Sequence, residues 1–317
     1  MKQYRALGGL AALALLTLTA CGGGSSNPLS TASSAVPASA SGSGSAPAGG
    51  AGSVTVGSAN FPENVLLAEI YAGALKAKGV QVTKKLSIGS RETYIPGLQD
   101  GSIDVIPEYS GVLLQYFDKA ATAVSSDDVY AALPKALPAT LQVLEQSKAE
   151  DKDAIVVSKA TADKYKLTSI ADLAPVAKDL VLGGPPEFKT RPDGVPGLAS
   201  KYSVTFKEFK ALDVGGPLTV NALKNGQVQA ADLFSTDSSI VTNGFVVLAD
   251  PKSLYTAQNV LPLINKAKLT PAITEALNGV SAKLDTPTLT TLLAKVAVDK
   301  KEPADVAAEW LKTNGLG

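Results

Sequence analysis

Residues 97–110 read GLQDGSIDVIPEYS and residues 222–235 read ALKNGQVQAADLFS, so the second stretch follows the first by 125 positions (222 − 97). In each stretch a helical segment ends at an Asx-Gly pair, an apolar strand follows, and an aromatic residue stands at the strand's carboxyl end. This shared order predicts two related halves. Ligands of open α/β sheets bind outside the carboxyl ends of the strands, so we expect Tyr109 and Phe234 to face one cleft.

The sequence on either side of these stretches alternates short apolar strands with amphipathic helices. Residues 54–57, 80–83 and 180–183 read as strands. Apolar side chains between Leu67 and Leu75 recur at helical spacing. The alternation is typical of an open sheet covered by helices, and the predicted fold class is α/β with two lobes.

The C-terminal third reads as helices. Thr270-Pro271 and Thr286-Pro287 are predicted to be the N-cap and first residue of two of them. Trp310 lies on the apolar face of the last helix, four residues after Val306, and we expect it to be a core residue.

The N-terminus has the features of an export signal. Lys2 and Arg5 precede an apolar run over residues 6–17, which is too short to span a bilayer as a helix. The run leads into Leu-Thr-Ala-Cys, which resembles the lipobox of bacterial lipoproteins. We therefore predict that residues 1–20 are a signal peptide and that Cys21 carries a diacylglycerol.

A tether is predicted between this anchor and the folded part, over residues 21–52. From Gly22 to Gly52 the chain contains only Gly, Ser, Ala, Pro, Thr, Val, Leu and Asn, without a charge. Such a composition cannot bury enough apolar surface to fold. The reach of this segment is about 30 Å, which keeps the folded part near the membrane.

Composition excludes several kinds of protein. The chain has no histidine, which argues against the usual serine-hydrolase triad and the commonest metal ligand. Cys21 is its single cysteine, so acylation leaves no thiol for a disulfide or a zinc site. Removal of the signal leaves 27 basic against 29 acidic residues, a net charge of −2. Because no basic run is present, we expect no nucleic-acid partner; we also expect no metal and no cofactor.

Several motifs, in order along the folded part, indicate a family. They are GSANFPE at 57–63, LQDGSID at 98–104, PEYSG at 107–111, EFKTRPDG at 187–194, FSTD at 234–237, and PADVA with WL between 303 and 311. Together they resemble the ProX-type substrate-binding proteins of osmoprotectant (glycine betaine, carnitine, choline) ABC importers, over residues 54 to 316.

The resemblance implies a fold, partners and a location. The fold would be a type II periplasmic-binding-protein fold with two crossover strands. One lobe would comprise residues 53–150 plus 250–317, and the other residues 151–249. The protein would be a monomeric receptor, not an enzyme, held at the extracytoplasmic face of the cell membrane. It would deliver a small molecule to an ABC permease and its ATPase.

The resemblance also implies ligand-binding residues. In this family aromatic rings surround a cationic head and basic groups hold a carboxylate. Tyr109 and Phe234 match positions of the aromatic cage, and Arg191 matches the arginine that meets the carboxylate. Asn60 belongs to the same motif as the family's carboxylate-binding lysine, but Ala59 stands in that lysine's place.

The two crossovers depart from the family pattern and leave the ligand open. Asp151 and Asp153 stand where relatives often carry a polar and an aromatic residue, and Gln258 and Asn259 replace part of an aromatic run. The extra carboxylates would favour a plain cation such as choline. The amides would instead suit a neutral polyhydroxy or phenolic ligand, because they both donate and accept hydrogen bonds.

Each of these residues also has a simpler interpretation. Tyr109 and Phe234 could be core aromatics, and Arg191 could form a surface salt bridge with Asp193. Asp151 and Asp153 could belong to a solvated turn. A lipid-anchored enzyme that uses Asp151, Asp153 or Tyr109 as acid or base, and a sensor or adhesion module without transport, are the alternative classes.

Overall fold

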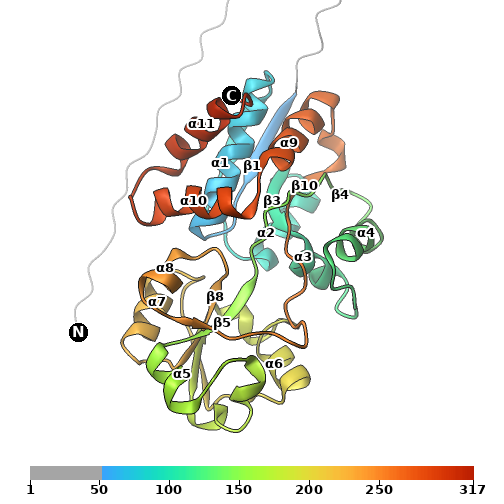
Figure 1. The fold of residues 1–317 in the computed structure, drawn as a ribbon. Coiled ribbons are helices and arrows are strands. Elements are labelled where there is room, and N and C mark those ends of the chain that lie inside the picture. The colour runs from blue at the N-terminus through green and yellow to red at the C-terminus, as the bar shows by residue number, and fades with distance from the viewer. Residues whose placement is uncertain (1–51) are drawn as a thin grey trace, which may run out of the picture. The chain divides into compact units, whose positions relative to one another are not determined.

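The computed structural model describes residues 52–317 (Figure 1). The predicted signal peptide, Cys21 and nearly all of the tether lie outside these residues. The strands are β1 (Ser53–Gly57), β2 (Gln81–Lys85), β3 (Val105–Tyr109), β4 (Leu141–Val143), β5 (Asp153–Val157), β6 (Val181–Gly184), β7 (Glu208–Ala211), β8 (Ala230–Phe234), β9 (Val246–Val247) and β10 (Val260–Asn265). The α-helices are α1 (Pro62–Ala77), α2 (Arg91–Asp100), α3 (Ser110–Phe117), α4 (Ser126–Ala136), α5 (Lys159–Tyr165), α6 (Val195–Tyr202), α7 (Pro217–Lys224), α8 (Ser238–Thr242), α9 (Pro271–Lys283), α10 (Thr286–Ala297) and α11 (Pro303–Thr313). The 3₁₀ helices are η1 (Ile170–Leu173), η2 (Ala177–Asp179), η3 (Pro186–Lys189) and η4 (Lys266–Lys268).

The strands form two five-stranded sheets. The first has the order β2-β1-β3-β10-β4 and the second the order β7-β6-β8-β5-β9. In the first sheet β1 runs parallel to β2 and β3, and β10 is antiparallel to β3 and β4. In the second, β6 runs parallel to β7 and β8, and β5 is antiparallel to β8 and β9. The predicted α/β class with two sheets and flanking helices is confirmed.

The duplicated stretch becomes a duplicated strand. β3 and β8 are separated by the predicted offset at both ends, Val105 to Ala230 and Tyr109 to Phe234. Each of the two is also the neighbour of an antiparallel strand reached from the other sheet. Tyr109 pairs with Val260 at the start of β10, and Phe234 pairs with Asp153 at the start of β5. The two aromatic residues therefore hold equivalent places.

Each sheet has its own apolar core. The predicted stripe of α1 from Leu67 to Leu75 is buried, and it packs with α9 and α11 beside the first sheet. Trp310 is 7% exposed and belongs to this core, as expected. A second cluster around Leu182 and Phe188 lies against the second sheet.

The helix starts of the C-terminal third agree with the prediction at one position and differ at the other. Thr270 caps α9 through a hydrogen bond from the Ile273 backbone N–H. The cap of α10 is Asp285, not Thr286, because its carboxylate accepts from the Thr288 N–H and completes the turn one residue earlier. None of the helices within residues 52–317 is long and apolar enough to cross a membrane.

Candidate ligand-binding site

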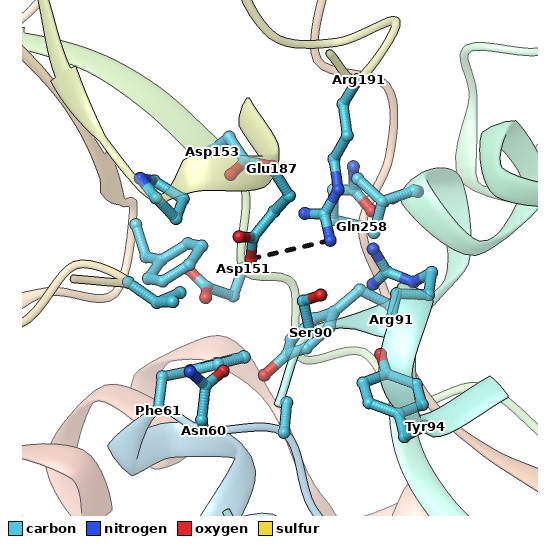
Figure 2. A pocket seen from close by; sticks show the side chains of 16 residues that line it. Asn60, Phe61, Ser90, Arg91, Tyr94, Asp151, Asp153, Glu187, Arg191 and Gln258 are labelled. Atoms are coloured by element: carbon cyan, nitrogen blue, oxygen red, sulfur yellow. Dashed lines mark hydrogen bonds and ion pairs between the residues drawn. The ribbon is translucent and has the colours of Figure 1, made fainter. Parts of the chain in front are cut away.

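A cavity lies at the carboxyl ends of strands from both sheets, where ligands of open α/β sheets bind. The space that the centre of a water-sized sphere can reach is about 50 Å³. One water needs ~10–15 Å³ on this measure, so the cavity suits a group of a few heavy atoms. Its sixteen lining residues are Ala59, Asn60, Phe61, Ser90, Arg91, Tyr94, Tyr109, Val112, Asp151, Asp153, Pro185, Glu187, Arg191, Val214, Phe234 and Gln258 (Figure 2).

Three aromatic rings form one wall of this cavity. Phe61 follows β1, and its ring stacks on that of Phe234 with a centroid separation of 5.1 Å. The Phe61 ring is also 6.0 Å from that of Tyr109. Phe61 therefore links the two aromatic residues that the repeat predicts, and the three rings come from strand ends in both sheets.

Arg191 lines the cavity, but one side of its guanidinium group is already hydrogen-bonded to a carboxylate. Its Nε and Nη2 donate to the two carboxylate oxygens of Glu92, at 3.1 and 3.0 Å. Glu187 lies 3.9 Å from Nη2, the contact dashed in Figure 2. Burial tends to raise the pKa of Glu92, but hydrogen bonds from Arg191 and Ser90 lower it to about 2. The alternative partner considered from sequence, Asp193, does not form an ion pair with Arg191 in the described residues.

Arg91 is likewise paired, in a fully buried group. Its Nε and Nη2 donate to Glu108 at 2.8 Å each. The Tyr94 hydroxyl and the Tyr109 backbone N–H also donate to this carboxylate. Burial, together with the Glu108 charge, raises the pKa of Tyr94 well above its usual value, so the hydroxyl keeps its proton and serves as a donor. Glu108 is 0% exposed, and this network fixes the end of β3 against α2.

Several carboxyl groups near the cavity, unlike the two arginines, form no ion pair among residues 52–317. Asp151 and Asp153 both line it, and Glu63 lies behind Tyr109, whose hydroxyl donates to Glu63 Oε1 at 2.9 Å. Burial, with the charge of Asp193 as the next cause, raises the pKa of Asp153 to about 7. Burial also raises the pKa of Asp193 and the pKa of Asp232. The Oδ1 atom of Asp232 has no hydrogen-bond partner among the described residues.

Gln258 is held in place by a close approach of two backbone segments. Its side-chain oxygen accepts from the Val112 N–H at 2.9 Å. A Cβ on Gly111 would lie 2.2 Å from Thr256 Oγ1 and 2.5 Å from the Ala257 carbonyl oxygen, so only glycine fits at the start of α3. The oxygen of the Gln258 amide is therefore engaged with the backbone and not free for a ligand.

The structure brings together eight of the nine residues expected at the site. These are Tyr109, Phe234, Arg191, Asn60, Ala59, Asp151, Asp153 and Gln258. Asn259 is not among the lining residues. It is 8% exposed, donates to the Ser147 carbonyl and accepts from the Ser126 hydroxyl, and so it connects the crossover to its neighbours.

Sequence reasoning missed several residues near the cavity. Phe61 was part of a quoted motif but not a predicted ligand contact, and Arg91, Tyr94 and Glu187 were not singled out. The strand-end rule would have found Phe61 if it had been applied to β1 as well as to β3 and β8. Glu63 follows two residues later, at the start of α1.

Comparisons with known proteins agree with this geometry. Residues 52–313 match the family described as the substrate binding domain of ABC-type glycine betaine transport systems. The glycine betaine-binding protein YehZ of Escherichia coli is 28% identical over 276 residues, covering 83% of this chain and 90% of that protein. The glycine-betaine-binding protein of Pseudomonas aeruginosa is 26% identical over 281 residues, covering 83% of this chain and 88% of that protein.

Solved structures show the same fold. A glycine betaine/carnitine/choline ABC transporter structure superimposes with a TM-score of 0.64 at 23% identity, covering 83% of this chain and 98% of that one. Ligand-free YehZ gives a TM-score of 0.56 at 26% identity, covering 83% of this chain and 99% of that one.

Two five-stranded sheets with a cavity at their strand ends match the fold of periplasmic-binding-protein-like structures. The chain belongs to the family of substrate-binding domains of ABC-type glycine betaine transport systems. It is thus an extracytoplasmic substrate-binding protein that binds a small molecule and delivers it to the permease and ATPase of an ABC importer.

Proposed function

We propose that the cavity binds a quaternary ammonium cation without a carboxylate, with choline as the model ligand. The observation that carries the proposal is the combination of three rings, Phe61, Tyr109 and Phe234, with Asp151 and Asp153, whose carboxyl groups form no ion pair among residues 52–317. A quaternary ammonium has no N–H to donate, so ring faces and carboxylates are the groups that attract it. Its four-atom head matches a cavity of about 50 Å³.

The energetics are sufficient for a useful affinity. Each ring contributes about 0.5–2 kcal/mol through cation–π attraction, and three rings together about 1.5–6 kcal/mol. A desolvated carboxylate beside the cation adds a charge–charge attraction. Micromolar binding requires about 8 kcal/mol, which this combination can reach.

A carboxylate-bearing ligand is disfavoured because both arginines in the cavity are engaged. Arg91 is bound by Glu108 and Arg191 by Glu92, each through two hydrogen bonds. A zwitterion's carboxylate would meet only the remaining N–H groups of guanidinium ions whose charge is already balanced by Glu108 or Glu92. A neutral polyhydroxy ligand is disfavoured for a related reason, since the Gln258 oxygen is engaged and Asn259 lies outside the lining.

Isothermal calorimetry tests the proposed function. Choline chloride, glycine betaine, carnitine, a sugar and a polyol are titrated into the protein. We expect saturable heat with choline and a weaker response to glycine betaine. Binding of the sugar or polyol with no response to any quaternary amine would overturn the proposal. Turnover of a bound ligand would indicate the enzymatic alternative.

Removing the Glu92 charge is expected to admit carboxylates. In Glu92→Gln the guanidinium group of Arg191 loses its anionic partner and becomes available to a ligand carboxylate. A charge-assisted hydrogen bond contributes ~1.5–3 kcal/mol, so the Kd for glycine betaine should fall about tenfold or more, while that for choline changes little. Titrations of both ligands measure this.

The control for this substitution is Glu275→Gln. Glu275 pairs with Lys78 on the surface, and its side chain is 70% exposed, so both affinities should stay at the wild-type values. A Glu92→Gln protein that binds choline normally but glycine betaine no better than wild type would contradict the blocking role of Glu92.

We also propose that the receptor is lipid-anchored through Cys21 after cleavage of residues 1–20. The lipobox-like sequence and the uncharged linker behind it support this anchor, and two acyl chains suffice for stable membrane attachment. Cys21→Ser should move the protein from the membrane fraction to the soluble extracytoplasmic fraction of expressing cells. Unchanged membrane association would argue for another means of attachment.

A further inference from the structure

Two buried carboxyl groups meet next to the aromatic wall. Glu63 at the start of α1 is 2% exposed, and Asp151 in the crossover before β5 is 4% exposed. Thr236, after β8, contacts both of them. Its hydroxyl donates to Glu63 Oε2 at 2.6 Å, and its backbone N–H donates to Asp151 Oδ1 at 3.1 Å. The pair thus joins a helix beside the first sheet to a loop of the second.

The remaining hydrogen bonds to this pair come from neutral groups. The Tyr109 hydroxyl donates to Glu63 at 2.9 Å, and the Ser235 hydroxyl donates to Asp151 at 3.2 Å. Among residues 52–317, no ion pair within 4.0 Å includes either carboxyl group.

Other charged groups near the pair do not neutralise it. The negative charge of Asp237 raises the pKa of Glu63. The charge of Asp151 likewise raises the pKa of Asp153 and of Asp232, so the neighbours of the pair are acidic as well. The charges of Arg191 and Arg91 act on the neighbouring Asp153, and each arginine is already bound by a carboxylate of its own. The pair is therefore a buried, uncompensated anionic site.

Two carboxyl groups in this arrangement cannot both be ionised cheaply. A buried carboxylate strongly favours protonation, and a second carboxylate at hydrogen-bond distance raises one pKa further. Burial is the main cause that raises the pKa of both Glu63 and Asp151, and the Glu63 charge raises that of Asp151 further. This arrangement favours one proton shared between the two groups when no cation is bound, and a pair so coupled titrates as a unit.

This pair borders the space proposed for the ligand. Asp151 and Tyr109 both line the cavity, and the Tyr109 hydroxyl connects the cavity wall to Glu63. A cation against the rings would supply the positive charge that the shared proton supplies when the cavity is empty. We propose that Glu63 and Asp151 together form the counter-ion of the bound cation, and that the cation displaces their shared proton.

The exchange is balanced in charge and atoms. One quaternary cation enters, one proton leaves to solvent, and no covalent bond other than O–H changes. A neutral ligand gains nothing from the exchange, so the pair also selects for positive charge. This inference rests on the proposed function, because it concerns the cation that the proposed function places in the cavity.

The direction of the pH dependence follows from linkage. The folded, empty protein holds a proton that the unfolded chain releases near the ordinary carboxyl pKa of about 4. The pair's contribution to stability is therefore complete below that pH and is lost as the pH rises through the raised pKa values. Cation binding has the opposite trend. Its affinity rises with pH, by up to about tenfold per unit while one proton is released.

Calorimetry in two buffers tests the exchange directly. The full-length protein is titrated with choline chloride at about pH 6, where the unfolded carboxyl groups would be ionised, in phosphate and in imidazole buffer. A released proton is taken up by the buffer, so the observed enthalpy should differ by the difference in buffer ionisation enthalpy, for about one proton per choline. The Kd should also fall as the pH is raised.

Glu63→Gln separates the charge from the shape of the side chain. The amide can donate the hydrogen bond to Asp151 that the shared proton makes, so choline should still bind but without proton release. Glu69→Gln on the same helix, whose carboxylate pairs with Lys84, should behave as wild type. If Glu63→Gln loses its cooperative unfolding transition, Asp151→Asn provides the same comparison.

The outcomes distinguish this inference from the proposed function. Choline binding with equal enthalpies in the two buffers overturns the proton exchange alone. Proton release that persists unchanged in both Glu63→Gln and Asp151→Asn assigns it to other groups and also overturns the inference. Absence of heat from every quaternary amine overturns the proposed function, and the exchange with it.

Discussion

Replacing Phe61 by alanine is expected to raise the Kd for choline by roughly 5- to 30-fold. The Phe61 ring lies 5.1 Å from Phe234 and 6.0 Å from Tyr109, so its removal abolishes one cation–π surface and loosens the other two rings. The loss of one such surface is ~0.5–2 kcal/mol, and each aromatic pair contributes ~0.5–1.5 kcal/mol. The ring pairs are present with and without ligand, so only the lost cation–π surface acts directly on binding; in a desolvated site it contributes about 1–2 kcal/mol, measured as the change in Kd by calorimetry.

A phenylalanine outside the cavity provides the matched control. Phe245 is half-buried, packs against a second apolar cluster of the second sheet that includes Val156 and Leu233, and is not among the residues that line the cavity. Phe245→Ala should lower stability but leave the Kd of the folded protein within about twofold of wild type. A Phe61→Ala protein that binds choline as tightly as wild type would show that this ring takes no part in binding.

Replacing Arg91 by methionine is expected to lower the free energy of unfolding by about 3–5 kcal/mol. The change leaves Glu108, which is 0% exposed, without the guanidinium that donates to both of its oxygens. An uncompensated carboxylate in this position must be protonated or hydrated at a large energetic cost. Urea unfolding followed by circular dichroism measures the loss.

A second substitution should reverse most of this effect. In Arg91→Met with Glu108→Gln no charge remains, and the Tyr94 hydroxyl still has an oxygen to donate to. Lys159→Met is the control, because the Lys159–Asp163 pair is exposed on both sides and should contribute under about 1 kcal/mol. A loss in Arg91→Met no larger than that of Lys159→Met would contradict the burial argument.

Much of the fold could be predicted because strands and helices follow from the spacing of apolar residues within short segments. The repeat at an offset of 125 residues predicts equivalent strands, and the alternation of apolar runs and helices predicts the strands and helices near each copy. The same repeat brought Tyr109 and Phe234 to one cavity. Both results depend only on neighbouring residues and on the rule that ligands lie at strand ends.

The charge partners in the cavity could not be predicted, because they depend on long-range packing. Asp193, two residues away, was the partner considered for Arg191, whereas Glu92 from α2 binds it from 99 positions away. Glu63 and Asp151 likewise come from different parts of the chain, and Thr236 contacts both of them. A resemblance to relatives does not reveal such pairs where, as with Ala59 and Asp153, the chain departs from the family's usual residues.

A crystal structure of the protein grown with choline tests the central claim most directly. We predict the trimethylammonium group among Phe61, Tyr109 and Phe234, with Asp151 as its nearest carboxyl group and the Arg191–Glu92 pair intact. Choline outside this cavity, or a ligand carboxylate on Arg191 in place of Glu92, would contradict the assignment of the site to a plain quaternary cation.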